Sequence, residues 1–190
     1  MGSDSLEWSG LVLCGGESRR MGTDKATMGE PPWATRVARA LAGAGCEPVT
    51  LVGGGADVAA LGWDHVADTR PGAGPASALA DRAAAMAAGA AGRGLMVAAC
   101  DLPGLQHSDV RALMREVANG SPVAAYTVED RPQWSLVAMG PHGVAEIAAA
   151  DTAAGASMHA LLGHLLHPVT PEVPERVRDI DSPFDGPPTP

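Results

Sequence analysis

The stretch LVLCGGESRRMGTDKATMGEPPW, residues 11–33, opens as a short apolar run and changes at once into paired glycines followed by three cations. A short apolar run bounded by glycine is typical of a buried strand. Glycines after a strand let main-chain N–H groups approach an anion, and Arg19, Arg20 and Lys25 add positive charge to the same loop. The stretch therefore predicts a strand followed by a solvent-facing, anion-binding loop.

The rest of the chain alternates short apolar runs with alanine-rich helical stretches, which favours an α/β fold with a mainly parallel sheet. We predict a three-layer αβα sandwich around a Rossmann-like, mostly parallel sheet. Strands are expected over residues 11–14, 49–52, 65–67, 95–100, 123–128, 134–139 and 177–180. Helices are expected over residues 35–41, 77–88, 109–118 (with Ser108 as N-cap), 144–149 and 157–166.

The composition limits the function classes that remain. The chain has 190 residues, 46% of them hydrophobic, which is enough for one well-buried domain. Its net charge of -9 argues against a binder of nucleic acid or of membrane surfaces, because both need a basic face. The N-terminus lacks the pattern of a signal peptide and no apolar run is long enough to span a membrane, so we expect a cytoplasmic protein.

The three cysteines form no CxxC pair, which argues against a disulfide framework and a zinc site. Cys14 and Cys100 each end an apolar run, and we interpret them as small buried hydrophobic residues.

Carboxylates follow the predicted strands at positions where ligands bind in parallel sheets. Asp101 comes directly after the apolar run 95–100, where a carboxylate can hold Mg²⁺ or simply cap a turn. Asp179 and Asp181 share one face of an extended segment, and Asp181 could complete the metal site or face solvent. The loop after the first strand matches neither GxxxxGK[ST] nor GxGxxG, so the residue pattern alone does not identify the anion that the loop binds.

The loop sequence LCGGESRRMGTDKA resembles the LAGGxSxRMGxDK signature of the molybdenum cofactor guanylyltransferases, which belong to the GT-A-like nucleotidyltransferases. MGEPPW, ADTRPGAGPASAL, AACDLP and DIDSPFD are similar to the family segments LxGxPLW, DxxxxxGPLxGL, PCDxP and NxNTPED, in the same order over residues 11–185. We predict a single nucleotidyltransferase domain over residues 1–182, followed by a proline-rich tail over residues 183–190.

The resemblance also assigns roles to residues. Nucleotide binding is implied for Leu13, Cys14, Gly15, Gly16, Lys25, Gly53, Asp68 and Asp101, catalysis for Lys25, Arg19 and Asp101, and Mg²⁺ binding for Asp101 and Asp181. The implied reaction transfers GMP from GTP to the terminal phosphate of molybdopterin cofactor and releases pyrophosphate. Transient contacts with molybdoenzymes or other cofactor-biosynthesis proteins are also implied.

Four positions depart from the family pattern. Cys14 stands where alanine is common, Gly53 where a polar side chain is common, Trp134 where proline is usual, and Asp181 where asparagine is usual. The change at Trp134 lies beside the expected pterin site, so the identity of the acceptor substrate is not decided by the sequence.

Three alternatives therefore remain: a cytidylyltransferase, a nucleotidyltransferase with a sugar-phosphate or phospholactate acceptor, and a cofactor-binding homologue without turnover. Gly15, Gly16 and Asp24 favour guanine, because the cytidylyl branch tends to read LAAGxSxRMGxPK.

Overall fold

The computed structural model of the chain describes residues 6–15, 24–89, 92–150, 152 and 156–180. Within these residues one mixed sheet has the strand order β3-β2-β1-β4-β6-β5-β7, and β6 is antiparallel to both of its neighbours. The other pairs of neighbouring strands are parallel. The strands are β1 (Trp8–Leu13), β2 (Cys46–Val52), β3 (Asp64–Val66), β4 (Gly94–Ala99), β5 (Val123–Val128), β6 (Arg131–Met139) and β7 (Leu166–Val169).

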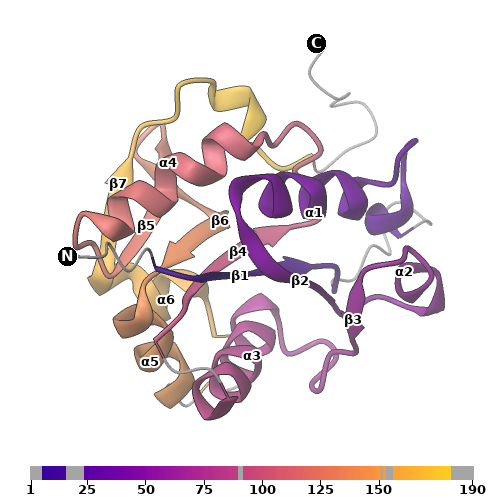
Figure 1. Cartoon of the computed structure of the whole chain (residues 1–190), viewed down its shortest axis with the longest axis horizontal. Helices are drawn as coiled ribbons and strands as arrows, with labels where there is room; N and C mark the ends of the chain where they lie inside the picture. The colour runs from indigo at the N-terminus through magenta and orange to yellow at the C-terminus, as the bar shows by residue number, and fades with distance from the viewer. Residues whose placement is uncertain (1–5, 16–23, 90–91, 151, 153–155, 181–190) are drawn as a thin grey trace.

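Helices cover both faces of this sheet (Figure 1). α1 and α4 lie on one face, and α3, α5 and α6 lie on the other. The predicted α/β sandwich with a mostly parallel sheet is confirmed. The α-helices are α1 (Trp33–Ala44), α2 (Ala56–Ala59), α3 (Pro75–Gly89), α4 (His107–Ala118), α5 (Pro141–Ala149) and α6 (Met158–Leu162), and the 3₁₀ helices are η2 (Lys25–Thr27), η3 (Gly163–Leu165) and η4 (Pro174–Arg176).

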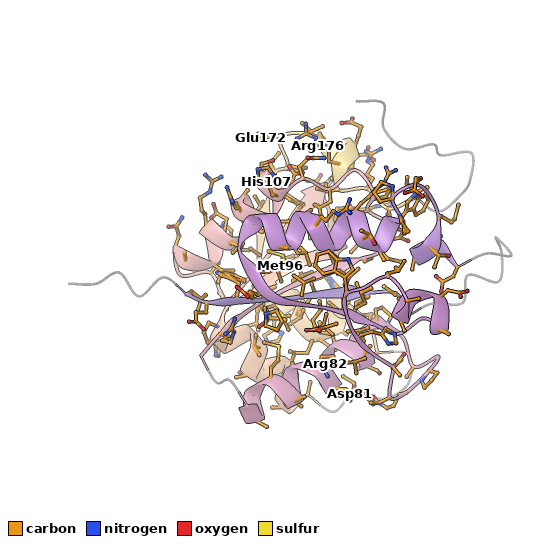
Figure 2. All side chains as sticks on the ribbon, turned by 45° about the vertical axis from the view of Figure 1, so that its right-hand side comes forward. Asp81, Arg82, Met96, His107, Glu172 and Arg176 are labelled. Atoms are coloured by element: carbon orange, nitrogen blue, oxygen red, sulfur yellow. The ribbon has the colours of Figure 1, made fainter. Side chains whose placement is uncertain are left out.

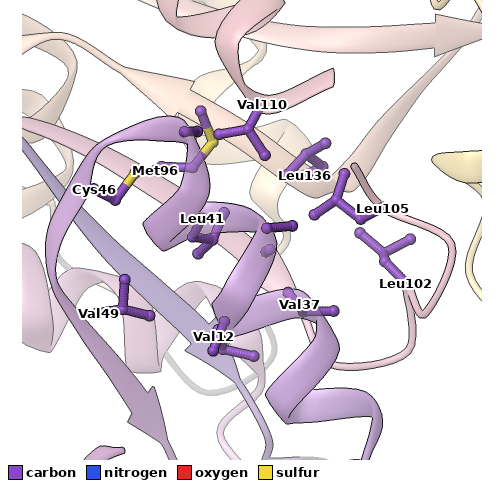
Figure 3. Packing of buried hydrophobic residues seen from close by; sticks show 14 of the residues in the cluster. Val12, Val37, Leu41, Cys46, Val49, Met96, Leu102, Leu105, Val110 and Leu136 are labelled. Carbon is purple, nitrogen blue, oxygen red and sulfur yellow. The ribbon is translucent and has the colours of Figure 1, made fainter. Parts of the chain in front are cut away.

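The central strand β4 is apolar throughout because both of its faces are buried. In β4, Met96 packs into the core under α1 and α4, while Leu95 and Val97 pack into the core on the α3 side. Figure 3 shows the first of these cores, where Met96 lies among side chains of α1 and α4 that include Leu41 and Val110. This double burial explains why the sequence of β4 shows no alternation of apolar and polar residues.

Several charged side chains lie on the outside of the two helical layers. Figure 2 shows Asp81 and Arg82 on α3 at one side of the molecule and His107, Glu172 and Arg176 at the opposite side. None of the described helices is long and apolar enough to cross a membrane.

The strand predicted over residues 177–180 is wrong. Val177 is the C-cap of η4, and the N–H of Ile180 donates to the carbonyl oxygen of Asp101 at 3.0 Å. The carbonyl of Ile180 accepts a hydrogen bond from Lys25 Nζ at 2.8 Å. The backbone polar groups of Ile180 are therefore satisfied by the loop after β4 and by a side chain, and not by a neighbouring strand.

The helix predicted over residues 157–166 is too long. α6 ends at Leu162, η3 follows, and Leu166 begins β7, which pairs in parallel with β5. Pairing with β5 overrides the helical pattern at this point, because β7 covers an edge that would otherwise leave backbone groups unpaired.

Ser108 is not the N-cap of α4. The helix begins two residues earlier, with Gln106 as N-cap in extended conformation, and Asp109 Oδ2 accepts the Gln106 N–H at 3.0 Å. An acidic residue at the third helical position satisfies an N–H that a serine at position 108 cannot reach. The other predicted elements exist, with ends that differ by a few residues.

Candidate active site

Two cavities open at the carboxyl ends of the central strands and share one wall. The smaller has a volume of about 360 Å³ and the larger about 700 Å³. The shared wall consists of Leu13, Cys14 and Gly15 after β1 together with Pro75 at the start of α3. Ligands of parallel α/β sheets bind at this end of the strands.

An ion pair between Lys25 and Asp101 lies in the smaller cavity. Lys25 Nζ is 3.2 Å from Asp101 Oδ2, and the two side chains keep only 16% and 18% of their exposure. Asp24 positions the lysine, because its side chain caps η2 by accepting the N–H of Ala26 at 3.0 Å. The expectation that this part of the loop faces solvent is wrong, because Lys25 is bound to the loop after β4 and to Ile180.

The groups around Asp101 compensate the negative charge of its carboxylate only in part. Burial raises the pKa of Asp101, the hydrogen bond and charge of Lys25 act in the opposite direction, and the charge of Asp179 raises the pKa further. Asp101 Oδ1 is buried and has no hydrogen-bond partner among the residues that the structure describes. A buried carboxylate oxygen without a donor is suited to accept a cation or a ligand group.

Asp179 belongs to this site, although the sequence analysis gave it no role. It lines the smaller cavity, and the Ile180 hydrogen bonds to Asp101 and Lys25 hold it there. Asp181, the residue predicted to share a metal, lies outside the described residues.

The larger cavity is formed where two glycines approach each other. A Cβ on Gly53 would lie 2.9 Å from the backbone of Gly15, and Gly53 has φ +81°. A side chain at position 53 is therefore disfavoured both by this close contact and by the left-handed backbone conformation. His65 Nε2 lies 2.9 Å from the carbonyl oxygen of Gly53. The absence of a polar side chain at position 53 therefore leaves room for the backbone of the loop after β1.

Asp68 also lines this cavity, close to Gly15, and is held by its own loop. Its Oδ1 accepts the N–H of Arg70 at 2.9 Å. The Arg70 guanidinium in turn donates to Asp81 of α3, with Nη2 to Oδ1 at 2.6 Å, and to the carbonyl oxygen of Thr152 at 2.9 Å. Arg70 and a short hydrogen bond from Thr69 hold the pKa of Asp81 below its usual range. The loop that carries Asp68 is thus fixed to α3.

Trp134 of β6 forms a wall of the smaller cavity, beside Ser135 and Met158. The ring of His159 contacts its indole at a centroid distance of 5.9 Å and an interplanar angle of 72°. A T-shaped contact occupies one edge or one face of the indole, so at least one face is not covered by His159.

The structure brings together most of the predicted site residues. Among the described ones, Leu13, Cys14, Gly15, Lys25 and Asp101 line the smaller cavity, and Leu13, Cys14, Gly15, Gly53 and Asp68 line the larger. Gly16 and Arg19 lie outside the described residues. In the part of the chain that is described, no group of three His, Cys, Asp or Glu side chains could hold a metal ion.

Residues 10–169 match the family of MobA-like NTP transferase domains. This chain belongs to that family. The resemblance drawn from the loop after β1 is therefore confirmed at the level of the MobA-like family.

Individual relatives of this MobA-like chain agree with the family match. A "Probable molybdenum cofactor guanylyltransferase" of Mycobacterium ulcerans is 38% identical over 117 residues, 60% of this chain and 58% of that protein. One of the same name from Opitutus terrae is 38% identical over 125 residues, 63% of this chain and 60% of that protein. The matched region thus spans less than two thirds of these curated relatives.

A solved structure supports the fold. Molybdopterin-guanine dinucleotide biosynthesis protein A from Archaeoglobus fulgidus has a TM-score of 0.66 at 19% identity, covering 93% of this chain and 94% of that one. At this identity the likeness establishes the fold alone.

The close approach of Gly53 to Gly15 makes a prediction about stability. Gly53→Ala is expected to unfold at a lower temperature than Gly62→Ala, although both glycines have φ +81°. Each alanine is strained by roughly 1–2 kcal/mol in the left-handed region, but only the one at position 53 also meets backbone within 2.9 Å. Thermal melts of the two variants measure the difference, and equal melting temperatures would mean that the contact between the two glycines costs nothing.

Proposed function

We propose that this protein transfers GMP from GTP to the terminal phosphate of molybdopterin cofactor, giving the guanine dinucleotide cofactor and pyrophosphate. The observation that carries the proposal is the Lys25–Asp101 pair, which places a cation and an under-coordinated carboxylate 3.2 Å apart in a cavity beside the glycine loop. The family match and the names of the curated relatives support this choice of reaction.

The two cavities are assigned to the two substrates. The larger cavity, with Gly53 and Asp68, takes the guanosine part of GTP. The smaller, with Trp134 and Met158, takes the acceptor. Their common wall at residues 13–15 is where the α-phosphate and the acceptor phosphate meet, and the loop glycines allow main-chain N–H groups to approach phosphate there.

Mg²⁺ fits the residues present. Within the described part of the chain, the buried Oδ1 of Asp101 has no hydrogen-bond partner, and Asp179 adds a second carboxylate to the same cavity. Carboxylates are the hard oxygen ligands that Mg²⁺ takes, usually one or two of them together with water and substrate phosphates. Bound there, Mg²⁺ would neutralise charge on the phosphate oxygens. Asp101 is therefore the main proposed ligand, with Asp181 as the second ligand that the family pattern implies.

The chain itself supplies position and charge. Lys25 lines the smaller cavity, and with Arg19 it would stabilise the pyrophosphate that leaves. A strong general base is not required, because a phosphate monoester has its second pKa near 6 and is largely ionised at neutral pH. Asp101 accordingly acts by holding charge and not by removing a proton.

The nucleotide preference is tested by thermal stabilisation. GTP with Mg²⁺ at about 100 times its Kd is expected to add roughly 2.7 kcal/mol to the free energy of unfolding, or on the order of 5–10 °C in Tm. CTP, ATP and UTP at the same concentration are expected to give smaller shifts, because Gly15, Gly16 and Asp24 follow the guanylyl pattern. A shift with CTP equal to or larger than that with GTP would assign the protein to the cytidylyl branch.

A second measurement separates an enzyme from a cofactor-binding homologue. Release of pyrophosphate from GTP in the presence of molybdopterin cofactor is expected for the enzyme. Stabilisation by GTP without pyrophosphate release, under conditions where a relative turns over, would contradict the proposed reaction.

A further inference from the structure

Two thiols lie side by side at the point where the nucleotide and acceptor cavities meet. The residue pair Leu13 and Ala99 is in register between the parallel strands β1 and β4, so the next residues, Cys14 and Cys100, face each other across the strand ends. The N–H of Cys100 donates to the carbonyl oxygen of Leu13 at 3.1 Å, which continues the strand pairing to this position.

Both thiols are on the same face of the sheet. Cys14 and Cys100 belong to the core cluster under α1 and α4, as do Val12 and Ala98 two residues earlier. The thiol of Cys14 donates to the carbonyl oxygen of Val12 at 3.6 Å. Because the two cysteines are in register and on one face of neighbouring strands, their side chains are neighbours, and neither is joined in a disulfide.

The spacing of the two residues suits a disulfide. Neighbouring strands lie about 4.7–4.9 Å apart, and a disulfide joins Cα atoms that are about 4.4–6.8 Å apart. A bond also requires the Cβ atoms to approach to about 3.5–4.5 Å, and a pair at the ends of two strands can adjust more easily than one at the centre. Only a small movement is thus needed to join them.

A small oxidant can reach the pair despite its burial. Cys14 and Cys100 are only 5% and 8% exposed, but both line the smaller cavity, and Cys14 also lines the larger. Cys46 is buried as well and is at the other end of the sheet, because it pairs with Trp8 at the start of β1. Six residues of strand, or about 20 Å, separate Cys46 from the pair.

We propose that Cys14 and Cys100 form a thiol modification site that a peroxide converts to a disulfide. The sulfur of one cysteine attacks an oxygen of the peroxide, the O–O bond breaks, and a sulfenic acid and one water result. The sulfur of the other cysteine attacks the sulfenic sulfur, the S–S bond forms, and the S–O bond breaks to release a second water. Two thiols lose two electrons and two protons, and one hydrogen peroxide is reduced to two waters.

The disulfide acts on the site through the next residue of each strand. Gly15 follows Cys14 and approaches Gly53, and Asp101 follows Cys100 and pairs with Lys25. Drawing the two strand ends together moves both residues, so the oxidised protein is expected to lose GTP binding. This consequence rests on the proposed function, whereas the disulfide itself does not.

The experiment treats the full chain with hydrogen peroxide, alkylates the remaining thiols and identifies the cysteine peptides by mass spectrometry. We expect a linked peptide pair that contains Cys14 and Cys100, with a mass lower by two hydrogen atoms, while Cys46 stays available for alkylation after unfolding. Formation is expected over minutes to hours, because both thiols are almost completely buried. Dithiothreitol should reverse it.

Variants separate this site from general oxidation. Cys46→Ala is expected to form the same linked pair as the wild type, and Cys100→Ser is expected to form none. Oxidised wild type should lose its GTP-induced rise in melting temperature, while Cys100→Ser should keep the shift that it shows before peroxide. A linked pair that includes Cys46, or none after prolonged oxidation, would overturn the thiol site. If GTP does not stabilise even the untreated protein, the proposed function fails while the linked peptide still tests the thiol site.

Discussion

Asp101→Asn is expected to lower the rate of nucleotidyl transfer by roughly 1,000-fold, equivalent to about 4 kcal/mol of transition-state stabilisation. Asparagine keeps the shape of the side chain but removes the negative charge, so the metal loses its main anionic ligand and Lys25 loses its partner at 3.2 Å. The measurement is the rate of pyrophosphate release at saturating GTP and matched Mg²⁺.

The same substitution is expected to leave the melting temperature of the ligand-free protein unchanged or higher. Because the pKa of Asp101 is raised in the folded chain, the folded state binds this proton more tightly than the unfolded state. The stability that this group contributes is fully present below the unfolded pKa and is lost as the pH rises through the folded pKa. At neutral pH the carboxylate therefore opposes folding, and the neutral asparagine removes that cost.

These two expectations together separate a functional charge from a structural one. Asp64→Asn, at an exposed aspartate of β3, is the matched control and should change neither activity nor the stabilisation by GTP and Mg²⁺. An Asp101→Asn protein that turns over at a near wild-type rate would rule out Asp101 as the metal ligand. An Asp101→Asn protein that melts far below the wild type would show that Asp101 stabilises the fold, which is the opposite of what its raised pKa predicts.

The main features of the fold follow from the sequence because short apolar runs and helical stretches alternate along it. That Lys25 and Asp101 lie near the carboxyl ends of the strands could also be predicted, since each follows a strand of a mostly parallel sheet. Their direct contact could not, because the two residues are 76 positions apart and only the sheet register brings them together.

The parts that sequence reasoning missed depend on pairing between distant segments. β7 is a strand because β5 offers it a free edge, although its residues continue a helical pattern. Asp179 enters the site because Ile180 is bound to Asp101 and Lys25, and not because residues 177–180 join the sheet. The contact of Trp134 with His159 likewise joins β6 to α6, and neither residue shows this locally.

Lys25→Ala is expected to lower kcat/KM by about 10- to 100-fold, because a charge-assisted contact to phosphate is worth roughly 1.5–3 kcal/mol. The loss should be larger in kcat than in KM if charge grows on the leaving pyrophosphate in the transition state. Steady-state kinetics with varied GTP measure both constants.

Lys25→Ala is also expected to lower the melting temperature. Lys25 Nζ donates to Asp101 at 3.2 Å and to the carbonyl oxygen of Ile180 at 2.8 Å, so the alanine leaves a half-buried carboxylate without this cation and a carbonyl without this donor. Leaving such groups unpaired typically costs about 1–3 kcal/mol. Kinetics must therefore be measured at a temperature where both proteins are fully folded.

Arg93→Ala is the control that distinguishes lost stability from lost chemistry. Arg93 binds Glu7 at 2.8 Å and the backbone at the amino ends of β1 and β2. The candidate site lies at the opposite, carboxyl ends of the strands. It is expected to lower the melting temperature while kcat/KM stays near the wild-type value. If Lys25→Ala likewise lowered the melting temperature and left kcat/KM near the wild-type value, Lys25 would have only the structural role of holding the segment around Ile180 against Asp101. The phosphate-binding role of the loop after β1 would then fail, and with it the main physical support for guanylyl transfer.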